Sequence, residues 1–597
     1  MPALPAAGTD CAPALQKYFV TRSKIFRRNR KETKSMKTNA KSFLILFVLI
    51  TAAFIPARAD FIKSTYTGPI GGNWSDPANW SPAIVPNNTP DTKFLVRVPA
   101  ESPGVILDLD VHLQKLKLTQ DFASSFVFGV SLTDFDLRSC ATSLGVDFAG
   151  EQYGGGLLYL TALTRDTVAD LGNLADFSGT TFNTGLMVAD ASAADPGVTA
   201  TIRFNNADVY ETSGYIGIYG ARSRIVDENG RNALRHLDHI LFNGFLDVET
   251  GRNFTTGGSF VNKGTLLSVA TGVIGPDAPT TVTIDGDYTG IGYPLDVDNQ
   301  GVIVVLAPGP TADAAVVING KVTNYDPATR TLHKTYYSWG AAGGRSATTQ
   351  VLGGTGSFDI QTSEASLVLT GPNTGFRDRN GQDALRNLST SARMLIGDRD
   401  FTTVGSFTTT SRLSIFGDTQ FTVNGDLTVS AGFLGLWPLT GYADQEEYGF
   451  PLDPAYLPAN LLVTGNFDLP AQSILRFHVY DANTLATVTV NGSVTLVGSL
   501  QSGVDDVSQL TSSDSITVMT ASHIVGQFSN VPSGGRINSY IAFDVDNNPI
   551  GDPLGSFLVT YDDSTFVLSD FQPAEGAWNR KFVPNDPDVR QRRLLKR

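Results

Sequence analysis

The feature that most constrains this chain is a set of internal repeats, because a repeated sequence unit folds into a repeated structural unit. The segment at 227–237 reads Asp-Glu-Asn-Gly-Arg-Asn-Ala-Leu-Arg-His-Leu. It recurs 151 residues later, at 378–388, as Asp-Arg-Asn-Gly-Gln-Asp-Ala-Leu-Arg-Asn-Leu. Downstream, Phe-Thr-Thr-Gly-Gly-Ser-Phe at 254–260 recurs as Phe-Thr-Thr-Val-Gly-Ser-Phe at 401–407. We expect the two copies of each pair to occupy equivalent places in the fold.

A shorter unit, apolar-Thr-apolar-Asn/Asp-Gly-x-apolar or close to it, occurs at least five times. Its copies lie at 283–288, 317–322, 422–427, 462–467 and 489–494. Asn-Gly between two apolar runs fits either the two-residue turn of an antiparallel hairpin or a corner between two short strands of a parallel solenoid. The long, irregular spacing of the copies favours the solenoid. So do the related Asn-x-Gly-x-apolar units at 262–266 and 299–303.

Past residue 60 the chain is typical of short strands closed by turns. Runs rich in Val, Ile, Leu, Phe and Thr alternate with Gly, Asn, Asp and Ser, as at 94–98, 281–284, 302–306 and 557–561. Charged residues make up only 17% of the chain, which excludes a coiled coil and disfavours helical bundles. The hydrophobic 41% is enough to fill a large core and argues against wholesale disorder.

Residues 36–59 have the composition of a secretory signal. A short basic start is followed at 43–55 by 13 mostly apolar residues and then by Ala-Arg-Ala at 57–59, the small-x-small form that a signal peptidase needs. The apolar run is too short to span about 30 Å of hydrocarbon, and no later stretch is long and apolar enough for a transmembrane helix. We therefore expect export, with Met36 as the true start and Asp60 as the first residue of the mature chain.

The distribution of charge along the chain limits the classes of partner that it can bind. Residues 1–59 hold 11 Lys/Arg and 2 Asp/Glu, so the rest holds 33 basic and 56 acidic residues. A body that acidic repels nucleic acid and anionic lipid, so we expect neither as a partner. The last 18 residues reverse the sign and fit a solvated, flexible end; docking of this tail on an acidic surface is the alternative.

Several of these segments resemble a known family. The segment at 72–86, Gly-Asn-Trp-Ser-Asp-Pro-Ala-Asn-Trp-Ser-Pro-Ala-Ile-Val-Pro, resembles the opening of bacterial secreted proteins with autotransporter-associated β-strand repeats. The two long repeats resemble the body of such proteins, and the segments at 490–500, 524–532, 557–561 and 566–568 resemble their end. The resemblance implies a right-handed parallel β-helix, passenger-like and exported to the surface or medium, and implies little about activity. The chain departs from the pattern in lacking the alternating strands of a C-terminal membrane barrel, so we do not expect it to anchor itself that way.

The expected fold class is therefore all-β: a right-handed parallel β-helix (β-solenoid) with a β-rich C-terminal segment. In chain order we expect an upstream extension at 1–35, a signal peptide at 36–59, a Trp-containing N-terminal cap at 60–120, β-helix repeats at 121–500, a C-terminal β segment at 501–572 and a basic flexible tail at 573–597. Trp74 and Trp80 fit a cap, because large aromatic side chains shield the first coil from end-to-end pairing. Stacking on a sugar ring is the other role open to them.

Catalytic motifs are absent from the sequence. It contains no His-Glu-x-x-His zinc helix, no Gly-x-Ser-x-Gly nucleophile elbow and no phosphate-binding Gly-x-x-x-x-Gly-Lys-Ser/Thr loop. His236 and His239 are close enough to share a metal, but no third ligand is evident, and the second copy has Asn387 in place of His236. Cys140 is the one cysteine of the expected mature chain, which excludes an internal disulfide, and we expect it to act as a small buried apolar residue.

Pairs of aspartates two residues apart are the remaining candidates, because side chains at i and i+2 of a strand share one face. The pairs are Asp134/Asp136, Asp296/Asp298 and Asp544/Asp546. Such a pair could bind Ca²⁺ or act as acid and base on a glycosidic bond, and Asp-x-Asp-Asn equally marks a turn. We take Asp296, Asp298, Asp544 and Asp546 as calcium candidates and expect no other cofactor.

Two functions follow from these observations. The first is a secreted or surface-exposed, non-catalytic β-solenoid that is structural or adhesin-like, with polysaccharide or cell-surface components as partners. The second is a polysaccharide-active β-helix enzyme, a lyase or hydrolase, that uses clustered aspartates. The second function predicts a groove lined by acidic and aromatic side chains, whereas the first needs no such groove.

Overall fold

The structure is a computed structural model that describes residues 60–577, apart from a set of internal gaps. The gaps are 70–71, 90, 99–104, 107–108, 110, 119–134, 137–141, 147–156, 163–165, 172–179, 183–185, 192–196, 243, 271–276, 292–300, 343, 355, 431, 440–455 and 545–546. Across the described residues the fold is all-β and most strands pair in parallel, as the sequence predicts. The two helical elements in this part are short 3-10 turns, η1 (Pro77–Asn79) and η2 (Val507–Gln509).

The strands gather into three stacks, and stack one is the longest. Its strands pair in parallel, each with the next. They are β4 (Val105–Ile106), β6 (Phe135–Asp136), β8 (Leu157–Ala162), β11 (Leu186–Ala191), β14 (Tyr215–Tyr219), β17 (Phe245–Glu249), β20 (Thr265–Val269), β23 (Val302–Ala307), β27 (Tyr336–Ala341), β29 (Thr362–Thr370), β31 (Thr390–Gly397), β33 (Phe407–Ile415), β36 (Phe433–Leu436), β39 (Ile474–Val479), β41 (Ser499–Val504) and β43 (Arg536–Tyr540).

Stack two consists of three successive sets of parallel strands. The first set is β1 (Asp60–Tyr66), β3 (Thr92–Val98), β5 (His112–Leu118), β7 (Thr142–Val146), β9 (Thr167–Asp170), β12 (Ala200–Arg203) and β15 (Ser223–Val226). The second is β18 (Asn253–Thr255), β21 (Thr280–Ile284), β24 (Ala314–Ile318), β28 (Ser346–Val351) and β30 (Asn373–Arg377). The third is β32 (Phe401–Thr402), β34 (Thr419–Val423), β37 (Ala459–Val463), β40 (Ala486–Leu496) and β42 (Ser515–Gly526).

Stack three is built from the shortest strands. It begins with β10 (Thr181–Phe182), β13 (Glu211–Thr212), β16 (His239–Ile240), β19 (Phe260–Asn262) and β22 (Tyr288–Gly290). It continues through β26 (Thr331–Leu332), which also pairs antiparallel with β25 (Tyr325–Asp326), and through the first residues of β29, β31 and β33. It ends with β35 (Leu427–Val429), β38 (Phe467–Leu469) and the later residues of β40 and β42.

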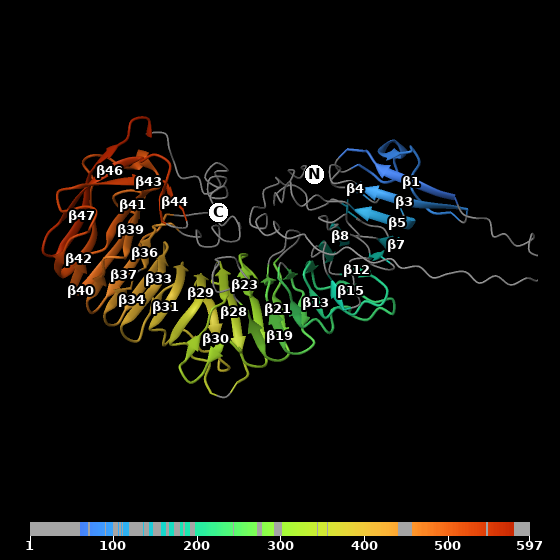
Figure 1. Ribbon diagram of the computed structural model, residues 1–597, viewed down its shortest axis with the longest axis horizontal. Coiled ribbons are helices and arrows are strands. Elements are labelled where there is room, and N and C mark those ends of the chain that lie inside the picture. Colours follow the sequence, from blue (N-terminus) through green and yellow to red (C-terminus); the bar gives the residue numbers. More distant parts are fainter. Residues whose placement is uncertain are drawn as a thin grey trace, which may run out of the picture.

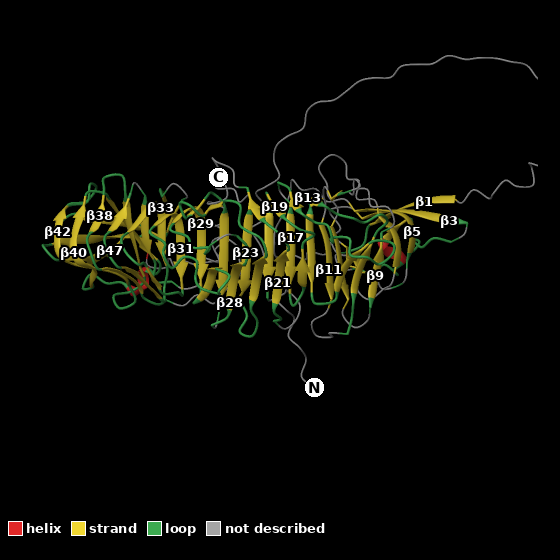
Figure 2. Cartoon of the chain, turned by 90° about the horizontal axis from the view of Figure 1, so that it is seen from below, coloured by secondary structure: helices red, strands yellow, loops and turns green. Residues whose placement is uncertain are grey.

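The chain passes through the stacks in a fixed order. Strands β16, β17 and β18 belong to stacks three, one and two, and β19, β20 and β21 repeat that order, as do β22, β23 and β24. We call one such passage a round. Each strand therefore pairs with the strand one round later, so that Leu246, Leu266 and Ile303 lie side by side on β17, β20 and β23. The result is a long curved array with β1 at one end and β47 (Thr565–Pro573) at the other (Figure 1), and its strands lie side by side along its length (Figure 2).

Alternation of side chains fills the interior. Strands β21, β24, β34 and β37 each bury their first, third and fifth residues and leave the second and fourth half-buried. Most of the buried apolar side chains, from all three stacks, form one continuous core. A second, smaller cluster of buried apolar side chains lies along stack one and includes Val304, Val368 and Leu395. Asn262 is the polar exception in the unit at 262–266: it is fully buried, donates to the Val302 carbonyl (2.8 Å) and accepts from the Gly264 amide (3.0 Å). Both ends of this amide are therefore satisfied inside the core.

The Asn-Gly and Asp-Gly units form bends between stack two and stack three rather than hairpins. The strands before the bends pair in parallel with one another, β21 with β24, and β34 with β37 and then β40. At the bends the glycines of successive rounds are in contact, because a Cβ added to Gly465 would lie 2.7 Å from the carbonyl group of Gly425. The backbone of the neighbouring round takes the space that a side chain would need, which explains the glycine in each copy.

The residues after Gly286, Gly425 and Gly465 are Asp287, Asp426 and Asn466, each with a short polar side chain that bonds to the next round. The Asp426 amide donates to the Ser406 hydroxyl (3.0 Å), the Asn466 amide donates to Asp426 Oδ1 (2.7 Å), and the Ser493 amide donates to Asn466 Oδ1 (3.0 Å). The same relay joins Ser259, Asp287 and Lys321 at 3.1 and 3.0 Å. Short acceptors at this position therefore satisfy backbone amides that lie between two strands and outside both ladders.

Antiparallel strands lie at both ends of the array. At the first end β2 (Trp80–Ser81) pairs antiparallel with β1, placing Trp80 beside Tyr66. Trp74 is fully buried and its Nε1 donates to the Pro86 carbonyl (3.0 Å), while Trp80 Nε1 donates to the Trp74 carbonyl (2.9 Å). Neither tryptophan therefore offers an open ring face on which a sugar could stack. At the other end β47 pairs antiparallel with β42 and with β46 (Gly555–Tyr561), which itself pairs with β43.

Replacement of Gly465 by alanine tests the contact between rounds. We expect Gly465→Ala to lower the free energy of unfolding by about 1–3 kcal/mol, because the new Cβ must displace the backbone of the previous bend. The measurement is the thermal and urea-induced unfolding of the variant. Gly405→Ala is the matched control, because a Cβ there meets no atom within 4 Å. An equal loss in both variants would contradict the interpretation.

Candidate functional site

Each copy of the long repeat folds into a compact corner built on one buried aspartate. In the second corner, residues 378–388, Asp378 Oδ1 accepts from the amides of Asn380 (2.8 Å) and Gln382 (2.9 Å). The first corner, residues 227–237, makes the same bonds at 2.9 and 2.8 Å with Asp227, Asn229 and Arg231. The corner therefore depends on a carboxylate that replaces a missing strand partner for two backbone amides.

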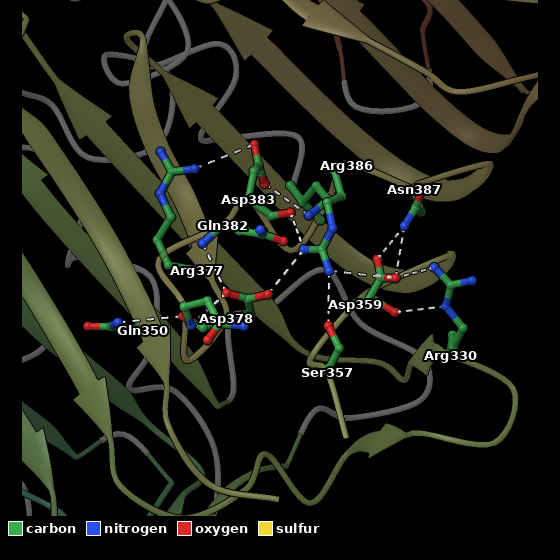
Figure 3. A network of polar contacts seen from close by, with 12 residues as sticks. Arg330, Gln350, Ser357, Asp359, Arg377, Asp378, Gln382, Asp383, Arg386 and Asn387 are labelled. Atoms are coloured by element: carbon green, nitrogen blue, oxygen red, sulfur yellow. Dashed lines mark hydrogen bonds and ion pairs between the residues drawn. The ribbon is translucent and has the colours of Figure 1, made fainter. Parts of the chain in front are cut away.

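An arginine joins each corner to the previous round. In the second corner Arg386 lies between Asp378 (3.4 Å) and Asp359 (3.8 Å), as Figure 3 shows. Asp359 also accepts from Asn387 (2.8 Å) and pairs with Arg330. The charged groups of this network are therefore paired with one another.

The first corner repeats this network and accounts for the two histidines. Arg235 pairs with Asp208 (2.7 Å), and His236 Nδ1 lies 2.8 Å from the other oxygen of Asp208. His239 pairs separately with Asp238 (2.6 Å), so the histidines face different carboxylates. His236 thus makes the bond to Asp208 that Asn387 makes to Asp359 in the second corner, which identifies its role as a hydrogen-bond partner within the corner.

The electrostatics of Asp227 agree with a structural role. Burial of the carboxyl raises its pKa, but the backbone amides of Arg231 and Asn229 and the guanidinium of Arg231 outweigh burial and hold the pKa below its ordinary value. The Arg231 guanidinium lies 2.7 Å from the carboxylate. The carboxylate therefore stays ionised and bound to its own loop.

A second polar cluster lies on the outward face of stack one. We call it the acidic–tyrosine cluster: Asp190 of β11, Tyr215 and Tyr219 of β14, and Asp247 and Glu249 of β17. It faces outward because these residues alternate along each strand with members of the core. Tyr219 donates to Asp247 Oδ2 (2.9 Å), Tyr215 donates to the same oxygen, and the two tyrosine hydroxyls lie 2.6 Å apart.

Asp247 and Glu249 of this cluster have pKa values above the usual range of a carboxyl group. Burial raises the pKa of Asp247 to about 6, against the opposing effect of hydrogen bonds from Tyr215, Tyr219 and Glu249. Burial, followed by the charges of Asp247 and Asp190, raises the pKa of Glu249 further. Burial and the nearby carboxylates also raise the pKa of both tyrosines. A protonated Glu249 therefore donates to Asp247, and the pair retains a proton near neutral pH.

A carboxyl pair that retains a proton is the arrangement of a general acid and base. Asp247 and Glu249 are nevertheless only 3% and 7% exposed, so access from solvent is limited. The sequence search missed this pair because it considered Asp-x-Asp alone. Asp-Val-Glu at 247–249 has the same i, i+2 spacing within a strand, so extending the pattern to Asp-x-Glu would have found it.

One of the four calcium candidates lies wholly in the described residues. Asp544 sits in the hairpin between β44 (Ala542–Phe543) and β45 (Pro549–Ile550), where its Oδ1 accepts from the Asn548 amide (2.8 Å). Arg476 donates to Asn547 of this loop (3.1 Å) and stacks on Phe543 (3.7 Å to the ring centroid). Asp544 therefore accepts a hydrogen bond within its own turn.

The other sequence candidates fall largely outside the described residues. Asp134, Cys140, Asp296, Asp298 and Asp546 lie there. Asp136 closes β6 of stack one. Within the described part of the chain, no group of three or more His, Cys, Asp or Glu side chains is placed to hold a metal ion. Over the same residues, no helix has the length and apolar composition needed to cross a membrane.

Comparisons with known proteins give no information on the function of these sites. No protein-family model, no curated protein and no solved structure matches the chain. The fold and the two polar sites are therefore interpreted from their own residues.

Removal of a corner aspartate tests its structural role. We expect Asp378→Ala to lower the free energy of unfolding by about 2–3 kcal/mol, because two backbone amides and Arg386 lose their acceptor. Thermal unfolding measures the loss. Asp552→Ala, at an exposed position, is the control and should unfold like the unmodified chain. If Asp378→Ala matched this control, the corner would not depend on its carboxylate.

The acidic–tyrosine cluster gives a pH dependence with a defined sign. The folded chain holds protons that the unfolded chain releases above pH 4, so the cluster destabilises the fold as the pH rises from about 4 through about 6 and beyond. We expect Glu249→Gln to raise the unfolding temperature relative to the unmodified chain more at pH 8 than at pH 5.

Unfolding temperatures at the two pH values measure this difference. Glu575→Gln, at an exposed glutamate, should leave the difference between pH 5 and pH 8 unchanged. A pH profile of Glu249→Gln that runs parallel to that of the unmodified chain would show that the carboxyl pair does not hold the extra proton.

Proposed function

We propose that this chain is a secreted or surface-exposed right-handed parallel β-helix, non-catalytic, with a structural or adhesin-like role. The order of the stacks supports the solenoid, because each round adds one strand to each stack and contacts only its neighbours. The glycine contacts at the bends support it further, because they join equivalent positions of successive rounds. Right-handedness follows from the strong preference of parallel crossovers for that hand.

The observation that carries the non-catalytic role is the pair of corners. The same Asp–Arg–Asp network is built twice, 151 residues apart, and in both copies it binds backbone and side chains of the chain itself. A structural device recurs wherever the structure needs it, whereas a single reaction needs a single site. The most conspicuous polar motif of the sequence is therefore assigned to holding the scaffold.

Export to the surface or medium is the second part of the proposal. The signal-like composition of 36–59 supports it. The acidic body favours polysaccharide or cell-surface components over nucleic acid as partners, because phosphate backbones are repelled. A long solenoid suits such partners, since it presents an extended surface.

A polysaccharide-active enzyme is the second candidate, and the acidic–tyrosine cluster is the observation that favours it. Asp247 and Glu249 provide an acid and a base two residues apart on one strand. In that case they would exchange a proton with a glycosidic oxygen or a ring carbon. This function requires a polysaccharide to reach side chains that are almost fully buried.

A glycan array combined with an assay for released sugar ends distinguishes the two functions. We expect the purified chain to bind a subset of glycans and to release no reducing or unsaturated ends from the same panel. Release of ends that is lost in Asp247→Asn and Glu249→Gln, but retained in Glu575→Gln, would overturn the proposal in favour of the enzyme. Absence of both binding and release would remove the adhesin-like role and leave the structural one.

A further inference from the structure

The glycine amides of the Asn-Gly pairs differ in one respect that bears on their chemistry. Five such pairs have both residues described, and the asparagine of each is exposed. In four of them the glycine amide donates to a carbonyl: Gly230 to Asp227 (3.0 Å), Gly320 to Gly286 (2.8 Å), Gly381 to Asp378 (2.9 Å) and Gly492 to Gly465 (3.0 Å). The amide of Gly425 is the exception among these five, since it makes no hydrogen bond to any described residue.

The cause lies one round earlier, in the repeat at 401–407. The Thr403 hydroxyl donates to the Gly405 carbonyl (2.6 Å), which holds that carbonyl within its own bend. The Asn424 amide donates to the same hydroxyl (3.2 Å). The carbonyl that would bind the Gly425 amide is therefore engaged by Thr403. One round later the pattern resumes, because Gly465 donates to the Gly425 carbonyl (2.9 Å).

The first copy of this repeat, at 254–260, has the same effect. The Thr256 hydroxyl donates to the Gly258 carbonyl (2.8 Å) and accepts from the Asp285 amide (3.1 Å). The amide of Gly286, like that of Gly425, makes no hydrogen bond to a described residue. The free glycine amide is therefore a consequence of the Phe-Thr-Thr-x-Gly-Ser-Phe repeat and is found one round after each copy.

We propose that Asn424 is a site of spontaneous deamidation in the folded protein. The Gly425 amide nitrogen loses its proton and attacks the Asn424 side-chain carbonyl carbon, and the new C–N bond closes a succinimide. The bond from that carbon to Nδ2 breaks, and the leaving nitrogen takes up the proton and departs as ammonia. Water then opens the ring on either side to give aspartate or isoaspartate. A glycine on the C-terminal side offers the least steric hindrance to this attack, and an amide hydrogen-bonded to a carbonyl is held away from it.

The packing around Gly425 excludes a larger residue at this position, so the reactive Asn-Gly pair is retained. A Cβ added to Gly425 would lie 2.6 Å from the Ser406 amide nitrogen, so a bulkier and less reactive residue does not fit. Deamidation adds a negative charge two residues from Asp426, whose carboxylate binds the Asn466 amide of the next round. Isoaspartate also lengthens the backbone between β34 and β35, whose registers with β37 and β38 are fixed.

Peptide mapping by mass spectrometry of the folded chain, incubated at pH 8 and 37 °C, tests the proposal. We expect conversion of Asn424 to exceed that of Asn229, Asn319, Asn380 and Asn491 severalfold. The four other sites are internal controls, because they share the Asn-Gly sequence and the exposure. The same incubation in urea removes the hydrogen bonds of the folded state, and we expect the five rates to converge there.

Two variants test whether the acidic deamidation product arises from Asn424. Asn424→Ser should abolish the acidic species that accumulates on ion exchange, whereas Asn491→Ser should leave it unchanged. Equal conversion at all five sites in the folded chain, or faster conversion at Asn319 or Asn491, would overturn the proposal. A preference for Asn424 that persists in urea would also overturn it, because the cause would then be local sequence and not the fold.

Discussion

The fold depends on direct backbone contact between successive rounds of the chain. At Gly320, Gly465 and Gly492 the glycine of one round lies against the glycine of the previous round, where a side chain has no room. The short acceptor that follows, Asp426 or Asn466, then bonds to the amide of the round after it. These two interactions keep the rounds in register while the apolar side chains supply most of the stabilising free energy. Register must be fixed at the bends, because a slip of one residue would turn every buried side chain outward.

The sequence predicts the class of fold well because its signals are local and repeated. The strand patterns at 281–284 and 302–306 lie in β21 and β23, and the parallel relation of the Asn-Gly units follows from their irregular spacing. The sequence does not reveal which glycine amide is left without an acceptor. That outcome depends on the Thr403 hydroxyl of the previous round. Thr403 is distant from Gly425 in the sequence and lies next to this bend only in the folded chain.

The candidate sites also differ in how far the sequence reveals them. The corners at Asp227 and Asp378 are visible in the sequence as a repeat, and the structure shows what the repeat is for. The acidic–tyrosine cluster has no repeat to reveal it, and its members come from three strands that are adjacent only after folding. Burial, which raises the pKa of Asp247 and Glu249, is likewise a property of the folded chain and not of the residues themselves.

An array of similar rounds repeats the interactions that hold it together, so a feature that occurs once requires a separate reason. The positions of Asp247 and Glu249 on stack one are occupied one round later by Leu267 and Val269. In the round after that, they are occupied by Val304 and Leu306. Packing alone is therefore satisfied by apolar side chains at these positions, whereas burial raises the pKa of both carboxyls and makes their ionisation unfavourable. Packing therefore does not account for Asp247 and Glu249, and this outward face of stack one is where the two proposed functions make different predictions.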